Sequence, residues 1–154
     1  MKYVIVVFLL VFVSSCQKDE GENVIIDYTE KNENEILDYL NENNLEAQKT
    51  SSGLYYMVLE EGEGNTPTSN SDVRVKYKGY FTNGKVFDQS DDEGITFNLQ
   101  QVIAGWTEGI IFFNEGGKGI LIIPSRLAYG SLNYSGIPGG SVLIFEIELL
   151  EVKE

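Results

Sequence analysis

Short runs of alternating apolar and polar residues fill the C-terminal two thirds of the chain. Between Val73 and Phe81 every second residue is apolar or glycine, and the residues between them include one arginine and two lysines. This period of two is typical of a strand that buries one face. Further strand-like runs, separated by turns rich in glycine, proline or acidic residues, cover residues 54–59, 86–87, 95–99, 119–123 and 142–152. The pattern predicts a mainly antiparallel sheet.

One segment inside this region has a helical period instead. Ile103, Trp106 and Ile110 fall on one helical face together with Phe113, which predicts a helix over 102–113. Several strands with one short helix define an α+β fold, and the apolar side of the helix is expected to cover the concave face of a curved sheet. The glycine-rich stretch 125–140 is expected to be a functional loop, because loops of this length in a compact domain are uncommon and more often have a function than not.

A second helix is expected upstream, in a strongly acidic zone. Residues 17–46 hold ten acidic residues against two lysines. Ile36, Leu37 and Leu40 are spaced as on one side of a helix, which predicts a short amphipathic helix over 34–45. This helix could pack on the domain, bind a partner, or hold the domain away from a membrane. The last role is the default expectation, since acidic segments are repelled by anionic lipid.

The first residues have the pattern of an export signal. Lys2 precedes an apolar run at 3–13, which as a helix would span roughly 16 Å, too short for a hydrocarbon core of about 30 Å. The run therefore predicts the core of a signal peptide. Residues 13–16, Val-Ser-Ser-Cys, resemble the lipobox of bacterial lipoproteins, in which the signal is removed before the cysteine and that cysteine is acylated. An ordinary secretory signal with an incidental Cys16 is the alternative.

These features divide the chain into three parts. A lipoprotein signal peptide is expected at 1–15, and a zone with the lipidated Cys16, an acidic tether and the short helix at 16–49. The folded domain covers 50–154. The lipoprotein resemblance implies an anchor in a membrane of the cell envelope, expected to be the outer membrane, on its periplasmic or surface side. The acidic stretch 17–20 resembles an export tag of surface lipoproteins, or is only a solvated linker. A monomer is expected, because no long dimerisation helix is visible.

Composition excludes several kinds of chemistry. The 154 residues include no histidine and a single cysteine. Histidine-dependent catalytic triads, histidine-ligated metals and cysteine-rich zinc sites are therefore excluded. No metal and no other cofactor is expected. The net charge of −13 argues against a nucleic-acid partner, because binding phosphates requires a basic surface.

Five motifs follow one another in the folded domain. They are VKYKGYF at 75–81, NGKVFDQS at 83–90, VIAGWTEG at 102–109, IPSRLAYG at 123–130 and LIFEIELL at 143–150. In order and approximate spacing they resemble the FKBP-type peptidyl-prolyl cis-trans isomerases, and so does the lead-in TSSGLYY at 50–56. The resemblance implies a curved five- or six-stranded antiparallel sheet wrapped around one short helix. It also implies a shallow aromatic pocket that holds a proline ring, with proline-containing polypeptides as partners.

The site residues are implied by the resemblance, motif by motif. The residues expected to carry catalysis are Tyr77, Phe87, Asp88, Ile103, Trp106, Tyr129 and Phe145. The residues expected to contact the substrate are Val102 and, in segments of variable length, Ile95, Tyr134 and Ile137. Trp106 would be the floor under the proline ring. The Ile103 N–H and the Tyr129 hydroxyl would bind carbonyl groups, and Asp88 would orient Tyr77 or polarise the amide.

The chemistry of prolyl isomerisation needs none of the residue types that are missing. An X–Pro bond rotates slowly because its C–N bond has partial double-bond character, with a barrier of about 20 kcal/mol, and no covalent bond breaks. Three functions are compatible with the sequence: an isomerase of extracytoplasmic proteins, a module that binds proline-containing segments as a chaperone or assembly factor, and a structural anchor. The complete set of pocket residues favours the isomerase. Gly139 and Gly140, where the family often has a second proline and a polar residue, are expected to make their loop mobile.

Overall fold

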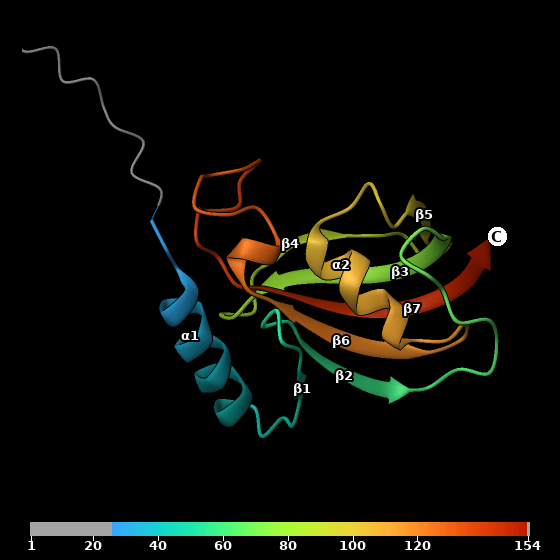
Figure 1. The fold of residues 1–154 in the computed structure, drawn as a ribbon, viewed down its shortest axis with the longest axis horizontal. Helices are drawn as coiled ribbons and strands as arrows, with labels where there is room; N and C mark the ends of the chain where they lie inside the picture. Colours follow the sequence, from blue (N-terminus) through green and yellow to red (C-terminus); the bar gives the residue numbers. More distant parts are fainter. Residues whose placement is uncertain (1–25, 154) are drawn as a thin grey trace, which may run out of the picture.

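A curved antiparallel sheet forms the body of the protein, and the computed structural model describes residues 26–153 (Figure 1). The strands are β1 (Gln48–Lys49), β2 (Tyr55–Glu60), β3 (Asp72–Phe81), β4 (Val86–Gln89), β5 (Ile95–Asn98), β6 (Lys118–Ile123) and β7 (Leu143–Lys153). Their order is β1-β2-β6-β7-β3-β4, and β5 pairs with β3 beyond the end of β4. The α+β prediction is confirmed. The sheet has seven strands, where five or six were expected. The additional strand is β1, whose two residues are too few to show a period in the sequence.

The alternation in β3 has the predicted consequence. Val73, Val75 and Tyr77 are buried, while Lys78 between such positions is exposed. β3 pairs with β7 from Asp72 to Phe81, so these two long strands form the centre of the sheet.

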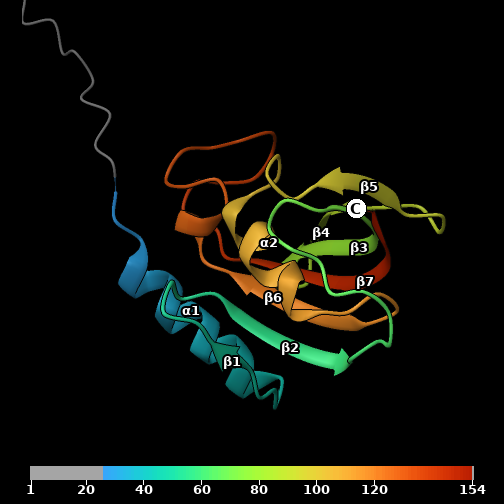
Figure 2. The same ribbon diagram turned by 45° about the vertical axis from the view of Figure 1, so that its right-hand side comes forward.

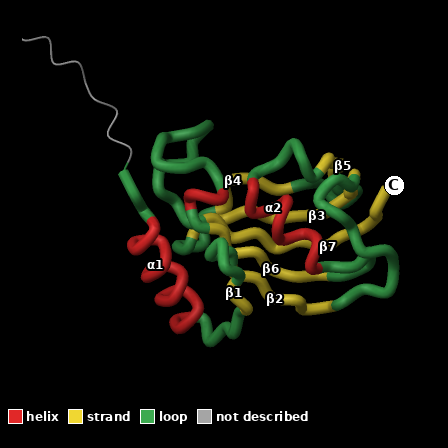
Figure 3. Tube along the Cα trace, viewed as in Figure 1, coloured by secondary structure: helices red, strands yellow, loops and turns green. Residues whose placement is uncertain are grey.

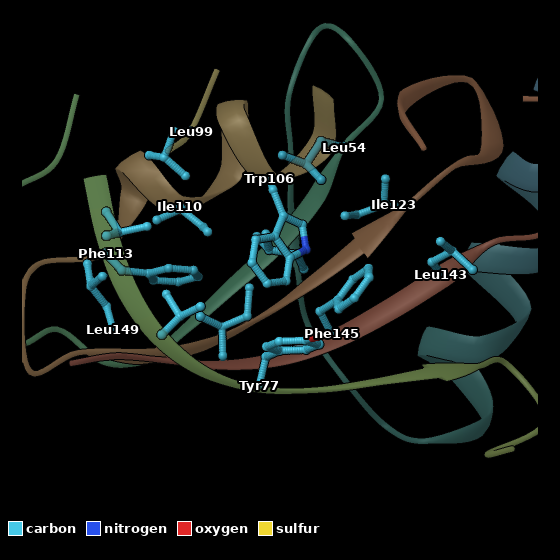
Figure 4. Packing of buried hydrophobic residues seen from close by; sticks show 14 of the residues in the cluster. Leu54, Tyr77, Leu99, Trp106, Ile110, Phe113, Ile123, Leu143, Phe145 and Leu149 are labelled. Atoms are coloured by element: carbon cyan, nitrogen blue, oxygen red, sulfur yellow. The ribbon is translucent and has the colours of Figure 1, made fainter. Parts of the chain in front are cut away.

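The predicted helix over 102–113 is present as two shorter pieces. The α-helix α2 (Ala104–Gly109) continues into a 3-10 turn, η1 (Ile110–Phe112). Figure 4 shows Trp106, Ile110 and Phe113 packed between this helix and the strands. The close approach of α2 to β6 depends on Gly109, since a Cβ there would lie 2.6 Å from a Leu121 methyl of β6.

The upstream helix, α1 (Thr29–Glu42), starts five residues before its predicted start and ends three before its predicted end. Ile36 and Leu40 are buried in a second apolar cluster with Met57, Ile122 and Ile144. Residues of β2 and β6 alternate between this cluster and the one around Trp106. Figure 2 shows α1 beside β1 and β2, with α2 lying across the sheet. Of the three roles weighed for this helix, packing on the domain is the one the structure shows.

The expected signal peptide and Cys16 lie outside the described residues. Among residues 26–153, no helix is both long and apolar enough to cross a membrane.

Candidate functional site

An aromatic cavity opens beside the start of α2. It has a volume of about 550 Å³ and lies between α2, strands β3 to β5 and the loop that joins β6 to β7. Its lining residues are Tyr77, Phe87, Asp88, Phe97, Gln101, Val102, Ile103, Ala104, Trp106, Ala128, Tyr129, Tyr134 and Phe145. A wider hollow of about 880 Å³ lies between α1 and the β3–β4 turn, but charged and polar side chains line it. Seven residues of the aromatic cavity's lining are aromatic, so this cavity suits an apolar ring.

Trp106 forms the floor of this cavity and is only 4% exposed. Tyr77, Phe97 and Phe145 meet its indole edge-to-face, at centroid distances of 5.1, 5.5 and 5.2 Å. Figure 4 shows the indole next to the rings of Tyr77 and Phe145. Each such pair stabilises a protein by about 0.5–1.5 kcal/mol beyond simple burial. The indole is thus held in one orientation before any ligand enters.

Gly79 of β3 has no side chain, which leaves space for two aromatic rings that form one wall of the cavity. Gly79 pairs with Phe145 of β7 and with Asp88 of β4. A Cβ at Gly79 would lie 2.7 Å from Cζ of Phe87 and 2.9 Å from Cε1 of Phe145. These two rings meet edge-to-face at 5.5 Å directly over the glycine. The motif 75–81 therefore needs glycine at this position for the aromatic wall to close.

Asp88 and Tyr77 form a hydrogen-bonded pair at the cavity. The Tyr77 hydroxyl donates to Oδ2 of Asp88 at 2.7 Å, and the Gln89 N–H donates to Oδ1 at 2.9 Å. Burial, followed by the hydrogen bond to Asp88, raises the pKa of Tyr77 far above its ordinary value. Tyr77 is therefore a protonated donor throughout the neutral range.

Ile103 marks the start of α2 at the edge of the cavity. Its backbone is extended, and its carbonyl accepts hydrogen bonds from the N–H groups of Trp106 and Thr107. Its own N–H has no intramolecular partner within the described part of the chain. An unpaired N–H at the first turn of a helix is available to a carbonyl oxygen of a ligand.

The long loop between β6 and β7 supplies the opposite rim. The rings of Tyr129 and Tyr134 stack at 4.4 Å, and Tyr134 is 55% exposed. Burial, with smaller effects of Tyr134 and Asp88, raises the pKa of Tyr129. Both Tyr129 and Asp88 line the cavity, so a hydroxyl and a carboxylate lie on the same opening.

Two residues expected in the site do not line the cavity. Ile95 lies on β5, where it pairs with Val75 of β3, and it is 39% exposed and outside the cavity lining. Ile137 belongs to the buried core, in a tight turn where its backbone exchanges two hydrogen bonds with Tyr134. Both lie in segments whose length varies, so motif matching alone did not fix their positions.

The cavity also contains residues that the motifs did not indicate. Phe97 contacts the floor and is the main addition, joined by Gln101, Ala104 and Ala128. Phe97 is two residues from Ile95 and so shares its side of β5. The strand period could therefore have identified it. Within residues 26–153, no group of three acidic or cysteine side chains lies close enough to hold a metal ion.

Comparison with known proteins agrees with the motifs. A sequence model described as FKBP-type peptidyl-prolyl cis-trans isomerase matches residues 63–150, which include every residue of the cavity lining. The isomerase FkpA of Escherichia coli strain K12 is 49% identical over 108 residues, covering 68% of this chain and 40% of FkpA. FkpA of Aeromonas hydrophila is 43% identical over 109 residues, covering 70% of this chain and 41% of that protein. The chain thus spans less than half the length of these curated relatives.

Solved structures show the same likeness. The crystal structure of FkpA from Escherichia coli superimposes with a TM-score of 0.73 at 42% identity, covering 80% of this chain and 60% of that one. A peptidyl-prolyl isomerase of Pseudomonas syringae pv. tomato has a TM-score of 0.71 at 32% identity, covering 82% of this chain and 96% of that one. The family model and the solved structures agree in sequence and in fold, and the chain belongs to the FKBP-type peptidyl-prolyl cis-trans isomerase family.

Proposed function

We propose that this protein is a peptidyl-prolyl cis-trans isomerase that acts without covalent chemistry, by binding the twisted X–Pro amide in the aromatic cavity. The observation that carries this proposal is the floor of the cavity, where the Trp106 indole is held edge-to-face by three other rings. Hydrogen-bond donors lie around the opening. An apolar floor of this kind suits a proline ring, and the donors suit the carbonyl groups on either side of it.

The rate effect follows from preferential binding of the transition state. A planar amide is strongly polar, and rotation about its C–N bond removes the resonance that makes it so. An apolar cavity therefore favours the twisted amide over the planar one. Each ~1.4 kcal/mol of this preference accelerates the reaction about tenfold.

The polar groups have distinct roles in this mechanism. The free N–H of Ile103 binds one substrate carbonyl, and the Tyr129 hydroxyl binds another. Asp88 holds the Tyr77 hydroxyl through the 2.7 Å hydrogen bond, so that the Tyr77 ring stays against Trp106. The carboxylate also lies on the cavity surface, where its charge acts on the amide carbon as the bond turns.

The substrates we propose are proline-containing segments of extracytoplasmic proteins, and the proposed location is the cell envelope, with Cys16 as the lipid anchor. The lipobox-like segment 13–16 supports this location. Residues 17–28 would then link the anchor to α1, a reach of roughly 40 Å when fully extended. Labelling with radioactive palmitate tests the anchor. Label in the wild-type protein and none in Cys16→Ser supports it, and equal or absent label in both overturns it.

The isomerase proposal is tested by a protease-free cis-trans isomerisation assay on the purified protein, with an X–Pro tetrapeptide as substrate. We expect acceleration by the wild type and at least about a fivefold loss of kcat/KM in Trp106→Leu. Phe112→Leu is the matched control, because Phe112 stacks on Tyr56 outside the cavity lining. No acceleration by well-folded wild-type protein would overturn the proposal and favour a module that only binds proline-containing segments.

A further inference from the structure

A buried amide links α1 to the loop that carries Tyr129. Asn32 is 1% exposed, although it lies on a helix at the outside of the sheet. Its Oδ1 accepts hydrogen bonds from the backbone N–H of Ser125 at 2.8 Å and from the Ser125 hydroxyl at 2.7 Å. Its Nδ2 donates to the carbonyl of Gly140 at 2.8 Å. One side chain therefore binds both ends of the 125–140 loop.

The loop is otherwise closed at its base by two backbone hydrogen bonds. The Gly130 N–H donates to the Ser125 carbonyl, and the Gly140 N–H donates to the Gly130 carbonyl, both at 2.8 Å. Tyr129 is the residue next to Gly130, so these hydrogen bonds hold the backbone beside it. Figure 3 shows the loop at the end of the molecule where α1 begins.

The chemistry of this contact requires an amide. The site presents one carbonyl acceptor and two donors, and an asparagine side chain satisfies all three. An aspartate would place a carboxylate oxygen against the Gly140 carbonyl. An aliphatic residue would leave three polar groups of the loop unpaired in a buried place, where each costs about 1–3 kcal/mol.

The helix that carries Asn32 is itself firmly placed. Ile36 is fully buried against the sheet, and Glu35 accepts a hydrogen bond of 2.7 Å from Thr82 in the β3–β4 turn. Tyr28, just before the helix, covers Gly140, where a Cβ would lie 2.3 Å from the Tyr28 ring and where φ is +77°. The helix is therefore a fixed support for the loop.

We propose that Asn32 is a positioning residue of the site, which holds the 125–140 loop so that the Tyr129 hydroxyl faces the cavity. Asn32 lies upstream of the matched segment 63–150, so full activity depends on a helix outside that segment. This inference rests on the proposed isomerase function. Gly140, one of the two glycines expected to make the loop mobile, is bound at both its N–H and its carbonyl.

The test combines amide hydrogen exchange with a double-mutant cycle on the purified protein. In Asn32→Ala we expect exchange of the Gly130 and Gly140 amides at least about tenfold faster, with the amides of β6 and β7 unchanged. We expect kcat/KM for an X–Pro tetrapeptide to fall about fivefold. Ile36→Val, which loosens the same helix without removing these hydrogen bonds, is the control and should leave both readouts within about twofold of wild type.

The cycle distinguishes positioning from general destabilisation. If Asn32 acts through Tyr129, the double variant Asn32→Ala/Tyr129→Phe loses no more activity than Tyr129→Phe alone. Losses that multiply, or loop amides that exchange as in wild type, would overturn the inference. Ser125→Ala removes one of the three hydrogen bonds and replaces Asn32→Ala in the cycle if that variant does not fold. We then expect a smaller loss of kcat/KM. An inactive wild type would instead overturn the proposed function, and hydrogen exchange would still decide whether Asn32 fixes the loop.

Discussion

The Tyr77 hydroxyl lies 2.7 Å from Oδ2 of Asp88 and joins strands β3 and β4 at the cavity. Tyr77 also meets Trp106 edge-to-face, so the carboxylate is coupled to the cavity floor through a single ring. The pair therefore affects both the shape of the cavity and its charge.

Removing the carboxylate should cost more activity than removing the hydroxyl. Asp88→Ala frees the Tyr77 ring and deletes the charge, and we expect kcat/KM to fall about tenfold or more. Tyr77→Phe keeps the ring and should lose about two- to fivefold. Asp92→Ala is the matched control, since Asp92 is exposed and pairs with Lys76. An equal loss in the control and in Asp88→Ala, measured in the tetrapeptide assay, would contradict the assigned role.

Stability should decline at alkaline pH. Burial raises the pKa of Tyr77 and of Tyr80 above the ordinary value of 10.0, with further contributions from Asp88 and Tyr39 respectively. The folded state thus keeps protons that the unfolded chain loses, so its extra stability is complete below pH 10.0 and is lost as pH rises further. Urea unfolding at stepwise higher pH should show a falling free energy of unfolding. The fall should be shallower in Tyr80→Phe, and an unchanged slope in that variant would contradict the assignment.

A methyl group at position 79 should damage both fold and site. In Gly79→Ala the new Cβ would lie 2.7 Å from the Phe87 ring, and we expect a loss of about 1–3 kcal/mol in stability with several-fold lower kcat/KM. Adding Phe87→Leu should recover part of the stability without restoring turnover, because the wall aromatic is then missing. Thermal unfolding and the isomerisation assay measure the two effects. Recovery of both together would contradict a role for Phe87 in the cavity.

Phe97 and Ile95 allow a test on one side of a single strand. Phe97 contacts the Trp106 indole at 5.5 Å, whereas Ile95 lies outside the cavity lining. We expect Phe97→Leu to lower kcat/KM about two- to tenfold, the range that corresponds to loss of one aromatic pair. Ile95→Ala should stay within about twofold of wild type. The reverse order would show that the substrate lies farther along β5 than the cavity indicates.

The periodic part of the fold was predictable from the sequence, and the contacts between distant segments were not. The period of two in β3 gave the buried face with Tyr77, and the helical period gave Trp106 as an inward residue. An apolar stripe such as that of Ile36 and Leu40 does not specify which surface it covers, so the docking of α1 needed the structure. The link from Asn32 to Ser125 joins residues 93 apart in the chain and leaves no local pattern.

The floor of the cavity also provides an optical signal. Trp106 is the single tryptophan of the chain, so the protein's indole emission comes from the surface on which a proline ring would settle. We expect a ligand that settles on this surface to change the intensity of that emission. Occupancy of the cavity is thus readable in unlabelled protein, by direct titration, with every variant that retains Trp106.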